Sequence, residues 1–132
     1  MESNNVRPHK KLIVWQKSID LVENIYKHSG KFPGSELYGL TNQLRRASVS
    51  ISANIAEGAA RRTSKDYLKY LNISRASLSE VDTLIDISLR LGYIDKSTHS
   101  EFTETMNHIG AMLNGLIRKV KNASSEIPAS AS

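Results

Sequence analysis

The sequence predicts an all-α protein that folds as an antiparallel, up-down-up-down four-helix bundle. Apolar residues recur at steps of three and four in four long segments, and no strand-type alternation of useful length occurs. Turn-forming residues separate the segments at 30–35, 58–64 and 92–97. At 1.5 Å per residue these segments give helices of roughly 25 to 40 Å, and short connections favour antiparallel neighbours.

The first two segments each carry a long apolar stripe. In residues 13–29 two adjacent rows are typical of a broad-faced amphipathic helix: Val14, Trp15, Ser18, Ile19, Leu21, Val22, Ile25 and Tyr26. In residues 35–60 one row follows alternating steps of three and four, the spacing of a bundle seam: Leu37, Leu40, Leu44, Ala47, Ile51, Asn54 and Gly58. We therefore expect helices over 13–29 and 35–60.

The last two helices are indicated by their caps as well as by their apolar rows. Thr63 can cap the third helix through its hydroxyl, with Asp66 closing a capping box, and Gly92 supplies its end. The fourth helix is expected to cap at Asp95 or Ser97. Its apolar row is Phe102, Met106, Ile109, Leu113, Leu116 and Val120. The chain thus divides into an N-terminal arm (1–12), a bundle domain (13–121) and a disordered tail rich in Ser and Ala (122–132).

Composition excludes several classes of protein. With no Cys among 132 residues, the chain has no disulfide framework, no zinc ribbon and no thiolate nucleophile. The longest apolar run is only a few residues and the N-terminus lacks an apolar signal core, so we expect a cytoplasmic protein without a membrane span.

No catalytic template fits the sequence. His9, His28, His99 and His108 are scattered without a paired histidine or a carboxylate motif, so no metal site is expected. Neither a phosphate-binding glycine loop nor a nucleophile elbow occurs. We expect no cofactor and no enzymatic activity, and an enzyme using Glu57 or a histidine ranks last among the hypotheses.

The net charge of +5 is concentrated in one segment of the sequence. Residues 45–75 hold seven Lys or Arg and two acidic residues, whereas the other 101 residues hold eleven of each. Four of the cations surround the predicted start of the third helix, where free backbone amides favour anions: Arg61, Arg62, Lys65 and Lys69. Arg45 and Arg46 extend this patch or bind a neighbouring subunit. The sequence leaves open whether the patch binds nucleic-acid phosphates or is a solvated basic face.

Polar residues within the apolar rows predict a structural polar layer. Asn54 and Arg75 fall in register with apolar neighbours, so both are expected to point inward, and Glu57 is placed to meet Arg75 across the helix interface. Glu57 also lies four residues before Arg61, a favourable helical ion-pair spacing. Among the aromatic residues, Trp15 is expected in the core and Tyr70 is expected to be exposed, where it can stack on a base.

The second predicted helix is rich in small residues, which let a neighbouring helix approach closely. They are Ala47, Ser48, Ser50, Ser52, Ala53, Ala56, Gly58, Ala59 and Ala60. Packing within the bundle and a subunit seam in a homo-oligomer both account for this composition.

Several motifs resemble the bacterial four-helix-bundle proteins encoded in 23S rRNA intervening sequences. The matching motifs occur in order over about residues 12–120: VWQK at 14–17, FP at 32–33, ELYGL at 36–40, QLRRA at 43–47, SI at 50–51, NIAEG at 54–58 and SLSE at 77–80. The sequence departs from the family pattern at Ala59, Ala60 and Ala76. The same superfamily includes the accessory variability determinant of diversity-generating retroelements.

This resemblance implies a bundle that assembles into a homopentameric barrel with a basic surface. In the retroelement relatives it implies binding to nucleic acid and to a reverse transcriptase. The family's polar positions match Arg45, Arg46, Asn54, Glu57, Arg61 and Arg75, which mark a pattern and not established binding residues. The leading hypothesis is a nonenzymatic, oligomeric protein that binds structured RNA. The alternative is a protein-interaction scaffold without direct nucleic-acid binding.

Overall fold

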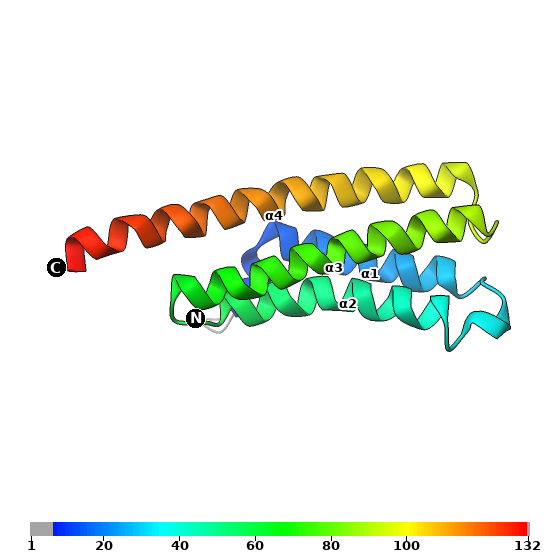
Figure 1. The fold of residues 1–132 in the computed structure, drawn as a ribbon, viewed down its shortest axis with the longest axis horizontal. Coiled ribbons are helices and arrows are strands. Elements are labelled where there is room, and N and C mark those ends of the chain that lie inside the picture. The colour runs from blue at the N-terminus through cyan, green and yellow to red at the C-terminus, as the bar shows by residue number, and fades with distance from the viewer. Residues whose placement is uncertain (1–6, 132) are drawn as a thin grey trace.

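The computed structural model describes residues 7–131, with side chains as far as Ala123. It contains four α-helices, and the described residues form no strand: α1 (Ile13–Ser29), α2 (Leu40–Ala59), α3 (Ser64–Arg90) and α4 (Lys96–Ala131). Two short 3-10 helices, η2 (Pro8–Lys11) and η3 (Gly34–Glu36), precede α1 and α2 (Figure 1). The predicted all-α class and the four helices are confirmed.

All four helices contribute to one core. The largest fully buried apolar side chains are Leu21 and Ile25 from α1, Leu44, Ile51 and Ile55 from α2, Leu71, Val81 and Ile85 from α3, and Ile109 and Leu113 from α4. Burial of such side chains removes apolar surface from water and is the main source of stability of a bundle. Among the described residues, none of the helices combines the length and the apolar character of a membrane span.

The caps predicted for α3 and α4 are present. The Thr63 hydroxyl accepts a hydrogen bond from the backbone amide of Asp66 at 3.2 Å, so Thr63 is the N-cap and Ser64 the first helical residue. Gly92, which follows α3, has a φ of 77°, a conformation that glycine adopts without steric cost. Before α4, the Asp95 carboxylate accepts from the Thr98 amide at 2.7 Å, and this bond lowers the pKa of Asp95.

The second helix begins at Leu40 and not at residue 35, which corrects the predicted boundary. The Glu36 carboxylate accepts from the Leu40 amide at 3.2 Å, and the chain turns sharply at Gly39. A Cβ at Gly39 would lie 2.9 Å from that carboxylate. Leu37 and Tyr38 consequently lie outside the helix and are 48% and 91% exposed. Leu37 is therefore not part of the seam.

The loops at this end of the bundle are tied to each other. The Tyr93 hydroxyl donates to the Glu36 carboxylate at 2.9 Å, and the Tyr93 ring lies 5.2 Å from the Phe32 ring. The hydrogen bond to Glu36 raises the pKa of Tyr93. The two loops therefore hold each other although they are distant in the sequence.

Small residues bring α2 and α3 into close contact. The Ser74 hydroxyl donates to the Ile51 carbonyl at 2.8 Å, and the hydroxyls of Ser50 and Ser77 are 2.8 Å apart. Four small residues of α2 are buried within the chain: Ala47, Ser48, Ser52 and Gly58. Packing within the bundle thus accounts for these four, whereas the subunit seam stays a prediction for the exposed Ala53 and Ala60.

The division into arm, bundle and tail stays a prediction, and the structure adds detail at both ends of the chain. Residues 1–6 of the predicted arm lie outside the described residues, whereas η2 packs against α1 and α2. Its His9 ring meets the Trp15 ring edge-on at 4.9 Å. At the other end, α4 extends beyond the neighbouring helices and continues to Ala131, past the predicted boundary at 121 (Figure 1). The disorder expected for 122–132 stays a prediction.

Candidate nucleic-acid interface

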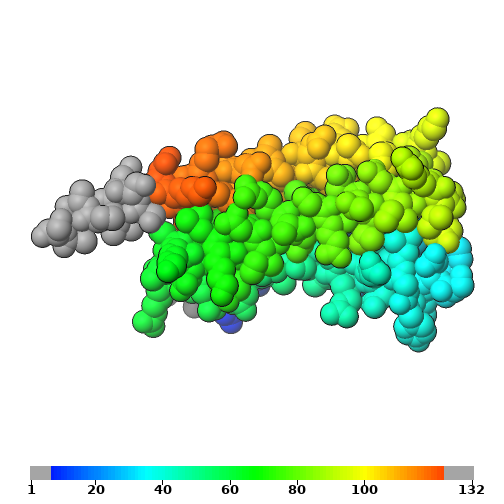
Figure 2. Space-filling view, in the orientation of Figure 1, coloured from blue at the N-terminus to red at the C-terminus, as the bar shows by residue number. Residues whose placement is uncertain are grey.

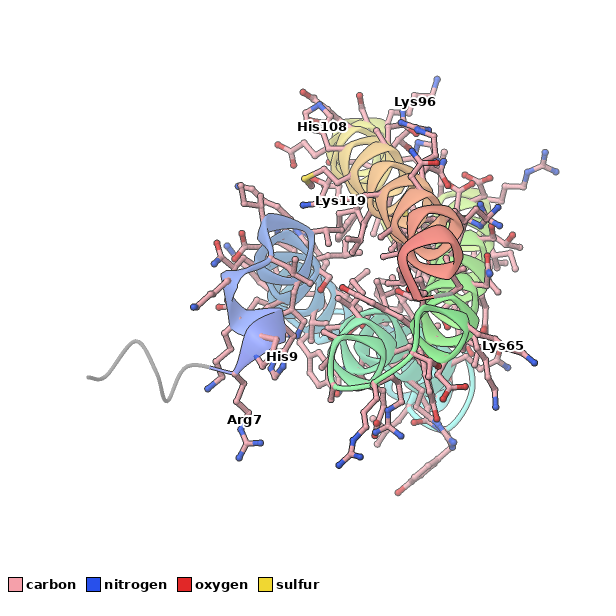
Figure 3. All side chains as sticks on the ribbon, turned by 90° about the vertical axis from the view of Figure 1, so that its left-hand side faces the viewer. Arg7, His9, Lys65, Lys96, His108 and Lys119 are labelled. Atoms are coloured by element: carbon pink, nitrogen blue, oxygen red, sulfur yellow. The ribbon has the colours of Figure 1, made fainter. Side chains whose placement is uncertain are left out.

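Four cations lie in the connection between α2 and α3 and in the first two turns of α3. Arg61, Arg62, Lys65 and Lys69, called the turn cations below, are all exposed. In the space-filling view the connection stands out at the lower left of the molecule, with α4 above it (Figure 2). The view onto this end shows Lys65 pointing away from the bundle (Figure 3). The α3 dipole adds positive potential here, because the first amides of a helix carry partial positive charge.

Few carboxylates neutralise the turn cations. Arg61 forms an ion pair with Glu57 at 2.7 Å and also donates to the Glu57 carbonyl at 3.1 Å. This is the predicted i,i+4 pairing. Among the side chains that the structure describes, no carboxylate pairs with Arg62, Lys65 or Lys69. At least three cations are thus available to an anionic ligand.

Arg45 and Arg46 do not extend this patch, which was one of the two predicted roles, whereas contact with a neighbouring subunit stays a prediction. Arg45 is half-buried, donates to the Ser29 hydroxyl at 2.9 Å and lies 4.6 Å from the centre of the Tyr26 ring. It therefore fastens α2 to α1. Arg46 is exposed, but 15 residues of chain separate it from Arg61, which along a helix is about 22 Å. The basic window of the sequence runs along most of α2 before it reaches the turn cations, so Arg45 and Arg46 lie far from them along the bundle axis.

The predicted polar layer of Asn54, Glu57 and Arg75 is wrong. Arg75 is exposed and donates to Asn114 at 3.1 Å and to Asn72 at 2.8 Å. Asn54 is half-buried and bonds to Ser50, whereas Glu57 is exposed. The buried stripes explain this outcome, since the inward positions are taken by Ile55 on α2 and by Ser74 on α3. A true helical period of 3.6 drifts away from a strict seam within a few turns.

The aromatic side chains near this end are packed against the protein. Tyr67 and Tyr70 are half-buried beside Gly58, and burial raises the pKa of Tyr67. The Arg61 and Lys69 side chains lie 5.4 and 5.7 Å from the centre of the Tyr70 ring. The expected exposure of Tyr70 is therefore wrong, whereas Trp15 packs against the core, half-buried, close to its prediction.

The sequence window missed three cations in or directly before η2, called the η2 cations below. Arg7, Lys10 and Lys11 are exposed, and η2 contacts α2 as well as α1. The Lys10 carbonyl accepts from the Gln16 side chain at 2.9 Å, which holds η2 on the start of α1. The start of α1 and the end of α2 lie at the same end of the bundle, and the view onto this end shows Arg7, Lys65 and Lys119 of α4 on different sides of it (Figure 3). We call this the basic end.

The fold separates charge along the bundle axis. The half that contains the basic end comprises residues 7–20, 50–77 and 113–123, with twelve Lys or Arg and three Asp or Glu (Figure 1). The opposite half comprises residues 21–49 and 78–112, with six Lys or Arg and eight Asp or Glu. The formal charges of the two halves are therefore +9 and −2. The potential at the basic end is stronger than the sequence window alone indicates.

The remaining concave surfaces offer no obvious chemistry. An open groove of about 520 Å³ between α1 and α4 is lined by Lys17, Asp20, Asn24, Thr105, His108, Ala111 and Met112. Within the described part of the chain, no three His, Asp or Glu side chains gather as metal ligands would. The predictions of no metal and no enzymatic activity remain predictions.

Comparison with known proteins identifies a family and solved structures with a similar fold. The family described as 23S rRNA-intervening sequence protein matches residues 10–115. A crystal structure of a protein with unknown function from the S23 ribosomal protein family of Bacteroides thetaiotaomicron VPI-5482 superposes with a TM-score of 0.74. It shares 22% sequence identity, over 80% of this chain and 98% of that chain, so the likeness concerns the fold. No curated protein matches the chain.

Proposed function

The chain belongs to the 23S rRNA-intervening sequence protein family, and from this premise we propose that it is a nonenzymatic, oligomeric protein that binds structured RNA. The basic end supplies the contacts, chiefly through Arg62, Lys65 and Lys69. The observation that carries the proposal is the separation of charge, +9 in one half of the bundle against −2 in the other.

This charge arrangement fits a polyanion better than a small anion. The cations belong to η2, to the connection between α2 and α3, and to α4, so one phosphate cannot reach them all. A nucleic acid offers many phosphates in a row, and each contact releases counterions. Such binding is independent of base sequence, since phosphate contacts position a nucleic acid without reading its bases.

The assembly proposed for the protein has two levels. Within the chain, we take the bundle to be antiparallel, up-down-up-down. Contacting pairs support this topology, because residue numbers rise on α2 as they fall on α3, from Ser50 with Ser77 to Gly58 with Tyr67.

Between chains, the family resemblance supports a homopentamer. The exposed Val49 and Ile73, each 41% exposed, offer apolar surface for subunit contact. A reverse transcriptase partner rests on the proposed relation to the accessory variability determinant.

Filter binding of a structured RNA over a series of salt concentrations tests the function. If about four or five phosphates are contacted per protomer, the slope of log K against log salt is about −4 to −5. Substituting all turn cations with Gln is expected to reduce the slope by about 3, because Arg61 is already engaged by Glu57. Undetectable binding at low salt eliminates the proposal, and an unchanged slope in the variant moves the site elsewhere.

A protein-interaction scaffold is the second function, and one observation favours it. Leu37, Tyr38 and Leu91, from the loops at the end opposite the basic end, are 48%, 91% and 53% exposed. Exposed apolar side chains of this size are common at protein interfaces. Copurification of a protein without nuclease-sensitive RNA, lost on substituting Tyr38 with Ser, would favour the scaffold.

A further inference from the structure

We propose that the basic end binds the backbone of double-stranded RNA, with the η2 cations on one row of phosphates and the turn cations on the other. This inference rests on the proposed RNA-binding function and names its substrate class. It is carried by the two separate cation groups and by the absence of a free aromatic platform between them within the described residues.

The two cation groups face different sides of the basic end. Arg7 and Lys65 point away from the bundle in different directions, with the end of α2 between them (Figure 3). Packed helix axes are about 8–10 Å apart, and long side chains add several ångströms on each side, so the outermost cations are on the order of 20 Å apart. A single strand presents one row of phosphates. A duplex presents two rows of phosphates on either side of each groove, and in A-form RNA the minor groove is wide and shallow enough to be contacted through its backbone.

The described aromatic residues near the basic end are not arranged for a single strand. Proteins that bind single strands stack bases on exposed aromatic rings. Here Trp15 meets the His9 ring, and Tyr67 lies against Gly58. Tyr70 is half-buried, and its ring is approached by Arg61 and Lys69. Contacts without stacking suit a double helix, whose bases are already stacked and which proteins recognise by shape and backbone.

Fluorescence anisotropy separates the two substrate classes. The full chain is titrated with a labelled 20-base-pair RNA duplex and with a labelled 20-residue oligouridine, both at 0.1 M salt. For each phosphate that the protein contacts, the affinity for RNA is about eightfold higher at 0.1 M salt than at 1 M salt. We expect the duplex to bind at least tenfold more tightly than the single strand. Equal or tighter binding of the single strand overturns the inference.

Two variants test the assignment of the two groups, beside the substitution of all turn cations with Gln described above, which is called the turn variant here. The η2 variant replaces Arg7, Lys10 and Lys11 with Gln, and a matched control replaces Lys27, Lys31 and Lys96, three exposed cations of the opposite half. The η2 variant is expected to lose at least tenfold in duplex affinity and less than threefold in oligouridine affinity, with the control within twofold of the parent. All three positions of each variant are exposed, so the helical circular dichroism of both should be unchanged.

The outcomes distinguish this inference from the proposed function. If the turn variant loses duplex affinity but the η2 variant behaves like the control, RNA binding stands and the two-sided contact is wrong. If neither RNA binds the parent protein at low salt, the proposed function itself fails.

Discussion

Replacing Gly58 with Ala should destabilise the protein, although alanine is the better helix former. Gly58 is buried in the last turn of α2, where a Cβ would lie 2.9 Å from Cδ1 of Tyr67, 3.1 Å from Cβ of Tyr70 and 3.2 Å from the Tyr67 carbonyl oxygen. Two of these atoms are backbone or directly attached to it and cannot rotate away. The added methyl group must therefore push the first turns of α3 outward.

The size of the effect follows from two opposing contributions. Overpacking a core costs about 1–3 kcal/mol, whereas Ala in place of Gly within a helix gains about 1 kcal/mol. The expected net loss is up to about 2 kcal/mol, which for a domain of this size lowers Tm by up to about 10 °C. Urea unfolding followed by circular dichroism measures it.

Gly110→Ala is the matched control for this substitution. Gly110 lies within α4, and the nearest atom to an added Cβ is Cδ2 of Leu78 at 3.6 Å, an ordinary van der Waals distance. This control should gain up to about 1 kcal/mol from helix propensity alone. The difference between the two alanine variants isolates the contact with α3. If both variants have the same free energy of unfolding within about 0.5 kcal/mol, the close approach of α2 and α3 at Gly58 is refuted.

Three further substitutions test single interactions, and a fourth, Arg46→Gln, serves as a control. Ser74→Ala removes the buried hydrogen bond to the Ile51 carbonyl and should cost about 0.5–1.5 kcal/mol in urea unfolding; an unchanged midpoint would mean that the bond contributes nothing. Asp95 has its pKa lowered by the Thr98 amide, so its contribution is present above the ordinary carboxyl pKa of about 4 and is lost as pH falls through the lower folded value. Asp95→Asn should therefore make Tm fall less steeply as the pH is lowered from about 5 to about 2. Parallel curves of Tm against pH for parent and variant would contradict this. Arg45→Gln should lower Tm by breaking the bond to Ser29, whereas Arg46→Gln at an exposed site should leave Tm unchanged.

Local signals in the sequence predict the helices and most of their ends. Thr63, Gly92 and Asp95 act through neighbours within three or four residues, so their capping is readable without a fold. The start of α2 escapes such reading because the Glu36 carboxylate accepts from the Leu40 amide after a turn at Gly39, and so the helix begins five residues later than the apolar spacing predicts. The apolar spacing from Leu37 alone continues the helix too far.

Side-chain pairing across helices was predicted less well, for a geometric reason. Arg75 and Asn54 were placed inward because they follow apolar residues at steps of three and four, yet Ser74 and Ile55 occupy those directions. A small serine in the seam gives no hydrophobic signal, and its hydrogen bond to the Ile51 carbonyl appears only once α2 and α3 meet. Polar residues beside a serine-containing seam are thus assigned to the wrong face by spacing alone.

The basic end shows why a charge window along the sequence differs from a charge patch on a bundle. Arg45 and Arg46 contribute two of the seven cations of residues 45–75 but lie at the far part of α2. Arg7, Lys10 and Lys11 lie outside the window, where acidic residues of the opposite half cancel them in the count. In the fold, the η2 cations lie at the basic end, whereas Arg45 and Arg46 do not. Substituting Arg46 therefore changes the charge of the window and leaves the proposed RNA site intact. Substituting Lys10 changes the proposed RNA site and leaves the charge of the window as it is.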